Sequence, residues 1–221
     1  MSTKESLHAI KSESAAADEQ PAMAACVKPR VKDRIFDTAC DLFYKHGIRD
    51  VGVDLIATEA GTNKMSFYRS FASKDALVVE YLRAQERGFW ARWEATVARH
   101  PGDPRRQIEA LFQDQMDLAM ANGCRGCALG NAAVEISDDE DALSMLVRGY
   151  KQQVRKRLRA LTHAMGAEDA ESLGDALMLL FDGGYFTRLV FPLGSGPIAA
   201  ALPAVRRLID AHLPQGDRHK H

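Results

Sequence analysis

Apolar side chains recur at three- and four-residue steps along most of the chain, which is the spacing of one face of an α-helix. The first such stretch extends from Val31 to His46 and ends before Gly47. Further helices are predicted over Asp54 to Ala60, Lys64 to Phe71, a long segment between Ser73 and Pro101, Pro104 to Leu118, Ala128 to Ile136, Leu143 to Leu161, Ala170 to Val190 and Pro197 to Leu213. No stretch of useful length alternates apolar and polar residues as a strand does. The pattern therefore predicts an all-α protein of about nine helices.

The two ends of the chain lack this periodicity. Residues 1–27 consist mostly of Ser, Ala, Glu, Lys and Asp, and residues 214–221 are also polar, so neither segment buries enough apolar surface to offset its ordering entropy. We expect a disordered N-terminal arm and a flexible tail. Between them, residues 28–75 carry three short helices and residues 76–213 carry the rest. A small N-terminal domain followed by a larger helical domain is the predicted organisation.

Composition narrows the class of protein. The 221 residues are 46% hydrophobic and carry a net charge of −1, which excludes collagen-like and wholly disordered chains and argues mildly against binding nucleic acid by bulk charge. Four cysteines are too few for a disulfide scaffold of this length, so a reducing compartment is expected. The N-terminal segment has no apolar run typical of a signal peptide, and Asp182 and Arg188 interrupt the most apolar later stretch. These features predict a cytoplasmic protein without a membrane span.

The N-terminal helices have the layout of a helix-turn-helix, in which the second helix of the motif enters the major groove. A glycine-containing turn joins the second and third helices, and Asn63 can cap the third. Phe67 and Phe71 are four residues apart and are expected to face the core. Lys64 and Tyr68, which are also four apart, then face solvent or DNA.

A resemblance to a known family is carried by Leu42-Phe43, Gly47, Ile56-Ala57, Ala60-Gly61, Phe67-Tyr68, Phe71 and Ser73-Lys74-Asp75-Ala76-Leu77. Over this segment of about fifty residues the chain resembles the TetR family of bacterial transcription regulators. The resemblance implies an all-helical homodimer with an N-terminal helix-turn-helix domain that binds double-stranded DNA. It also implies a larger domain that dimerises and binds a small effector. We therefore expect a regulator without enzymatic activity, most simply a repressor that a small molecule releases from a palindromic operator.

The resemblance places a set of side chains at the DNA by position. These are Asn63, Lys64, Met65, Ser66, Tyr68, Arg69 and Lys74. Tyr68 and Lys74 are expected to contact phosphates and the others to lie at or near base edges. A basic arm that can follow the backbone or the minor groove consists of Lys28, Arg30, Lys32 and Arg34. Since the acidic run 138–141 lies far along the chain, we interpret the net charge as the sum of two unlike halves.

The larger domain is expected to hold the effector pocket and the dimer interface. The predicted pocket lining is Phe89, Trp90, Trp93, Phe112, Met116 and Met120 for apolar walls, with Asn131, Glu135, Tyr150, Asp182, Tyr185 and Arg188 as polar groups. The predicted dimer interface, on the last two helices, is Leu173, Leu177, Leu180, Gly184, Leu202, Val205 and Ile209. Gly183 and Gly184 are costly inside a helix, which indicates that another backbone, most simply a partner helix, approaches there.

The cysteines suggest a different chemistry. Cys124 and Cys127 form a C-x-x-C, which is typical of a redox pair, and the intervening Arg125 favours a thiolate. Two alternatives therefore stay open, a thiol-based redox-sensing regulator and a small C-x-x-C oxidoreductase. A zinc site needs four ligands, and no second C-x-x-C or well-spaced histidine pair accompanies the first, so neither a metal nor a cofactor is predicted. Cys40, on the inner face of the first helix, is expected to be a small core residue.

Overall fold

The structure, a computed structural model, describes residues 29–136, 142–192 and 194–214. Within these ranges the chain forms nine α-helices and one short 3₁₀ helix, with no strand, as the hydrophobic pattern predicts. The two predicted arms, apart from Pro214, and the acidic run 138–141 lie outside the described residues. Among the described helices, none combines the length and the apolar character needed to cross a lipid bilayer.

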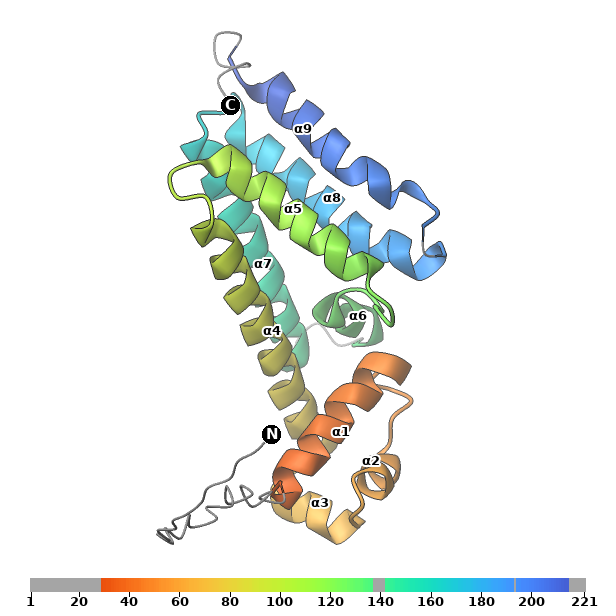
Figure 1. The fold of residues 1–221 in the computed structure, drawn as a ribbon. Coiled ribbons are helices and arrows are strands. Elements are labelled where there is room, and N and C mark those ends of the chain that lie inside the picture. Colours follow the sequence, from red (N-terminus) through yellow and green to blue (C-terminus); the bar gives the residue numbers. More distant parts are fainter. Residues whose placement is uncertain (1–28, 137–141, 193, 215–221) are drawn as a thin grey trace, which may run out of the picture.

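Three short helices pack together at one end of the molecule (Figure 1). They are α1 (Val31–His46), α2 (Val53–Glu59) and α3 (Lys64–Ser70). Each contributes a fully buried side chain to a common core, namely Ile35 from α1, Ile56 from α2 and Phe67 from α3. Removing these apolar surfaces from water holds three helices together that are too short to be stable alone.

Side-chain caps fix where the helices around the turn begin. Asn63 Oδ1 accepts the backbone N–H of Ser66 at 2.9 Å at the start of α3, as predicted. Ser73 Oγ accepts the N–H of Ala76 at 3.0 Å and opens α4 (Lys74–Ala98), which runs from the three helices toward the far end of the molecule (Figure 1). Such caps satisfy backbone donors that the first turn of a helix otherwise leaves unpaired.

The remaining helices are α5 (Pro104–Met120), α6 (Ala128–Glu135), α7 (Ala142–Ala164), α8 (Ala170–Val190) and α9 (Ala201–His212). Of these, α5, α6 and α7 contact α4, while α8 packs on α5 and α7 and α9 packs on α5 and α8 (Figure 1). The predicted helix from Pro197 to Leu213 is wrong at its start, where Pro197–Ala200 forms the 3₁₀ helix η1. Pro203 has no N–H to donate to the carbonyl of the fourth preceding residue, so the α-helical ladder cannot extend back through this turn.

Helices α7 and α8 approach one another very closely at Gly174. A Cβ atom built there would lie 2.6 Å from Cγ and 2.9 Å from Cα of Arg159. Because the backbone of α7 occupies this space, only glycine fits without displacing one helix. The hydroxyl of Thr162 adds a buried bond between the two helices by donating to the carbonyl of Ala170 at 2.6 Å.

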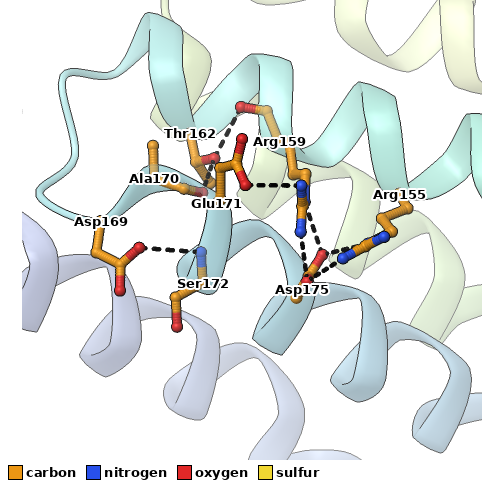
Figure 2. Close-up of polar contacts among 8 residues, drawn as sticks. All are labelled: Arg155, Arg159, Thr162, Asp169, Ala170, Glu171, Ser172 and Asp175. Atoms are coloured by element: carbon orange, nitrogen blue, oxygen red, sulfur yellow. Dashed lines mark hydrogen bonds and ion pairs between the residues drawn. The ribbon is translucent and has the colours of Figure 1, made fainter.

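Charged side chains flank this contact (Figure 2). Asp175 on α8 accepts paired hydrogen bonds from Arg155 at 2.6–2.7 Å and from Arg159 at 2.6–2.8 Å, both on α7. Arg159 also contacts Glu171 at 2.9 Å. The two guanidinium groups hold the pKa of the Asp175 carboxyl well below its usual range. Since water still reaches these half-buried and exposed groups, the ion pairs orient the two helices more than they stabilise them.

We predict that Gly174→Ala lowers the free energy of unfolding by about 1–3 kcal/mol, because the added methyl group overlaps the backbone of α7. The measurement is the urea midpoint of the purified protein. Gly149→Ala is the matched control, since a Cβ at that helical position in α7 meets nothing within 4 Å. It should leave stability unchanged or raise it by up to ~1 kcal/mol. Equal midpoints for the two variants would contradict the close approach.

Candidate DNA-binding surface and junction cavity

One face of α3 is buried and the other projects into solvent. Phe67 and Phe71 are 0% and 3% exposed, as their spacing predicts, whereas Met65 is 65% and Tyr68 51% exposed. Two large side chains with apolar surface are thus held in solvent on a helix of seven residues. A helix that presents such a face at the end of a molecule has the geometry for insertion into a DNA groove.

The cations around this face are paired with nearby acids. Lys64 Nζ lies 3.1 Å from Asp54 of α2, and Lys32 Nζ lies 3.2 Å from Glu80 of α4. Arg30 is bound to Asp33 at 2.9 Å in the same way. The interpretation of the net charge as two unlike halves is therefore incomplete, because acids also lie among the basic residues of the N-terminal helices.

The other predicted DNA residues have local partners as well. Lys74 Nζ contacts the carbonyl of Arg49 at 3.5 Å, and Arg69 contacts the sulfur of Met65 at 3.5 Å. Arg34, assigned to the basic arm, donates instead to the carbonyl of Ala60 at 3.3 Å and joins α1 to the α2–α3 turn. Lys28 lies outside the described residues.

A cavity of about 390 Å³ lies where α1 meets the larger domain. We call it the junction cavity. Of the predicted effector residues, Phe89, Tyr150 and Tyr185 line it. Its other walls include Cys40, Asp41 and Tyr44 of α1, Arg92 of α4, and Cys124 and Cys127 around the α5–α6 loop. The residues of α1 were missed because no local pattern in that helix indicates what a segment eighty residues later brings against it.

Several predicted lining residues lie elsewhere. Trp93 and Phe112 are 4% and 1% exposed and belong to the core, and Trp90 stacks with the Arg157 guanidinium at 4.2 Å from its ring centre. Asp182 pairs with Lys151 of α7 at 2.5 Å. None of these four is among the residues that line the junction cavity. Met116 is half-buried on α5. Met120 and Arg188 border a crevice near η1 that has no free volume.

Two predicted pocket residues instead hold the walls in place. Glu135, at the end of α6, accepts the backbone N–H of Arg49 at 2.8 Å, just beyond the C-terminus of α1. Asn131 donates to the carbonyl of Arg125 at 2.7 Å and so fixes the α5–α6 loop. Both side chains bind the chain itself, and neither is among the residues that line the junction cavity.

Tyr44, like Glu135, forms hydrogen bonds between the N-terminal helices and the larger domain. Its hydroxyl accepts the N–H of Arg125 at 2.8 Å, lies 3.2 Å from the carbonyl of Gly126 and is 3.9 Å from the sulfur of Cys124. Burial raises the pKa of this phenol, which therefore keeps its proton at neutral pH. We call Tyr44, Glu135 and their backbone partners the junction contacts.

The cysteines are free thiols at the cavity wall. Cys40 packs against the hydrophobic core, as predicted, and is half-buried at the wall of the cavity. Burial, followed by the nearby carboxylates of Asp37 and Asp41, raises the pKa of its thiol to about 12. No group of three or more His, Cys, Asp or Glu side chains within the described ranges is arranged to hold a metal ion.

Most of the predicted dimer residues cannot face a partner. Leu173, Leu177, Val205 and Ile209 are each 0% exposed within a single chain, because α8 and α9 pack on the core through them. Leu180 and Leu202 are half-buried against the same core. The nearest atoms to a Cβ at Gly184 belong to Gln115, 3.7 Å away, so no other backbone approaches this glycine within the chain.

A different apolar face of α8 is exposed. Leu179, Phe186 and Val190 are 77%, 66% and 60% exposed, and their spacing of seven and four residues places them on one side of the helix. Gly183 lies on the same side, and a Cβ there would meet nothing within 4 Å. Two adjacent exposed residues, Leu189 and Phe191, extend the apolar surface.

Comparison with known proteins identifies the N-terminal helices. Residues 35–81 match the sequence profile described as bacterial regulatory proteins, tetR family. The HTH-type transcriptional regulator BetI of Agrobacterium fabrum is 26% identical over 200 residues, which are 88% of this chain and 95% of the relative.

Solved structures extend the match to the whole fold. A TetR-family transcriptional regulator from Streptomyces coelicolor superposes with a TM-score of 0.78 at 28% identity, over 82% of this chain and 95% of that one. A transcriptional regulator from Saccharomonospora viridis, crystallised with choline, shares the fold with a TM-score of 0.68 at 20% identity, over 81% and 95% of the two chains. Together with the exposed face of α3 in a capped helix-turn-helix, these matches show that residues 35–81 form a DNA-binding region of the TetR type and that the described chain has the fold of TetR-family transcriptional regulators.

Proposed function

We propose that this protein is a homodimeric repressor that a small molecule in the junction cavity releases from a palindromic operator. The observation that carries the proposal is that one cavity is lined both by α1 and by helices of the larger domain. A ligand there touches the DNA-binding part directly. On this proposal residues 28–75 bind DNA, residues 76–213 bind the effector and the partner, and no step is catalytic.

DNA recognition is assigned to the exposed face of α3. Tyr68 has a hydroxyl suited to a phosphate, and Met65 an apolar group suited to a thymine methyl. Lys64 is held by Asp54, so it reaches DNA only when this exposed ion pair opens. Such pairs are weak, and a phosphate or a guanine competes readily with the carboxylate. Asp54 therefore restrains non-specific binding.

Asp54→Asn should release Lys64 toward DNA. The expected result is tighter binding to random-sequence duplex and a log–log salt dependence steeper by about 0.9, which corresponds to one more phosphate contact. Fluorescence anisotropy at several salt concentrations measures both quantities. The control Glu59→Gln removes the same charge from the other end of α2 without freeing Lys64. Identical salt slopes for the two variants would show that Asp54 does not restrain Lys64.

Dimerisation is assigned to the exposed face of α8 that contains Leu179, Phe186 and Val190. An isologous contact pairs this face with itself, and the open position at Gly183 lets two helices approach closely. A two-fold dimer also places two α3 helices for the two halves of a palindrome.

Phe186→Glu should raise the dimer dissociation constant at least about tenfold, because an aromatic anchor is replaced by like charges that face each other. Sedimentation equilibrium measures the constant. Met145→Glu serves as the control, since Met145 is 59% exposed but lies on α7. A Phe186→Glu protein that dimerises like wild type would refute the assignment of this face.

Effector release is assigned to the junction contacts. A ligand that moves the α5–α6 loop or α6 changes the positions to which Tyr44 and Arg49 are bonded, and so changes the orientation of α1. The aromatic walls and the size of the cavity suit a small organic molecule. The choline-bound structure from Saccharomonospora viridis supports small-molecule binding by this fold.

Glu135→Ala should accelerate hydrogen exchange at the Arg49 amide at least about tenfold, since a hydrogen bond to a charged group contributes about 1.5–3 kcal/mol. Amide exchange followed by NMR is the measurement. Glu135→Gln is the matched control, because its amide oxygen still accepts from Arg49 and should keep most of the protection. Unchanged exchange in the Ala variant would mean that this contact does not hold the junction.

A further inference from the structure

We propose that Cys124 is a covalent attachment site for a flat α,β-unsaturated carbonyl compound that enters the junction cavity. The inference rests on the proposed function, because it names the chemical class of the effector for the same cavity. In place of the redox chemistry that the C-x-x-C suggests, we assign to this site an addition reaction at the Cys124 thiol alone.

Three free thiols line this cavity, and their surroundings differ. Cys40 keeps its proton because burial raises its pKa to about 12, and a protonated thiol is a poor nucleophile. Cys127 is the N-cap of α6, where its sulfur accepts the N–H of Gly130 at 3.4 Å. Modifying Cys127 would therefore also disturb a helix end.

Cys124 lies in the α5–α6 loop, and two hydrogen-bond donors approach its sulfur. Its sulfur accepts the N–H of Gly126 at 3.4 Å, and the Tyr44 hydroxyl is directed at it from 3.9 Å. These contacts hold the Cys124 sulfur at the wall of the junction cavity, between the α5–α6 loop and α1. The Cys124 sulfur forms a hydrogen bond with a side chain of α1, that of Tyr44. Cys127 instead contacts Tyr150 of α7, so the two sulfurs have different neighbours.

The size and walls of the cavity favour an organic electrophile over a small oxidant. A volume of about 390 Å³ far exceeds the ~30 Å³ that a water-sized molecule occupies. Aromatic rings from Tyr44, Phe89 and Tyr185 form flat walls that suit a conjugated ligand. Arg92 lines the same cavity and offers guanidinium donors to a carbonyl oxygen.

The reaction balances without an oxidant. The Cys124 thiol gives its proton to water, and the thiolate forms a bond to the β-carbon of the enone. The electron pair of the carbon–carbon double bond moves toward the carbonyl, and the α-carbon then takes a proton from water. The net result is addition of S–H across the double bond, with no leaving group and no change in the redox state of the protein.

The adduct acts on the junction contacts. A carbon substituent on the Cys124 sulfur occupies the space between this loop and the Tyr44 hydroxyl, which are 3.9 Å apart. Tyr44 must then move away from Arg125 and Gly126, to which its hydroxyl is bonded. Because Tyr44 is part of α1, displacing its side chain acts directly on the N-terminal helices.

The test uses the full chain with Cys26→Ser, which removes the thiol that lies outside the described residues. The probe is 4-phenylbut-3-en-2-one, and its saturated analogue 4-phenylbutan-2-one has nearly the same size and the same ketone but no electrophilic β-carbon. DNA affinity without probe is measured first, on an operator selected from a random pool. Intact mass and peptide mapping then locate the adduct, and anisotropy measures the affinity of the modified protein.

We expect one adduct at Cys124 and an operator affinity at least about tenfold weaker, within the usual range of coupling between an effector and DNA. Cys124→Ser should abolish both effects. Cys40→Ser and Cys127→Ser are the matched controls and should retain them. The serine at position 127 still caps α6, so that variant keeps the fold.

Each other outcome overturns the inference in a distinguishable way. Release by the saturated analogue as well would leave an effector cavity without covalent chemistry. Release by hydrogen peroxide but not by the enone would assign the thiols to oxidation. An adduct at Cys124 without weaker DNA binding would refute its regulatory role. Absence of DNA binding before any probe is added would refute the proposed function itself.

Discussion

The Tyr44 hydroxyl on α1 binds the loop that precedes α6, and with Glu135 it joins the N-terminal helices to the larger domain by hydrogen bonds. A neutral hydrogen bond contributes about 0.5–1.5 kcal/mol and one to a carboxylate about 1.5–3 kcal/mol. The bonds of Tyr44 and Glu135 together are therefore worth a few kcal/mol. This is close to the 1–3 kcal/mol by which effectors typically change the affinity of a distant site. On the proposed function, the junction contacts are strong enough to set one orientation of α1 and weak enough for a bound effector to change it.

The sequence predicts local features of this fold well because their causes are local. The period of apolar residues and a following glycine define α1, and Asn63 and Ser73 mark the starts of α3 and α4 with side chains that cap them. The buried Phe67 and the exposed Tyr68 follow from the geometry of one helix. The tightest contact between helices, at Gly174, has no such signal, since its cause is the backbone of Arg159 on another helix.

The faces of α8 and the walls of the cavity are not predictable for a related reason. Leu177 is buried and Leu179 is 77% exposed, yet both are leucines in a helix with apolar residues on every side. Which of them meets the core depends on how α7 and α9 are placed. The cavity likewise combines Tyr44 with Cys124, whose roles depend on a contact across eighty residues of chain. In both cases the missing information is tertiary, and composition carries none of it.

The apolar core residues of α8 and α9 are buried within a single chain. Leu173, Leu177, Val205 and Ile209 are covered inside one chain, while the face of α8 with Phe186 is left over. The burial of this core therefore needs no second chain. If two chains join through α8, the amount of dimer at low expression varies with the square of the chain concentration. Occupancy of a palindromic site then responds more steeply to expression level than a monomeric binder would.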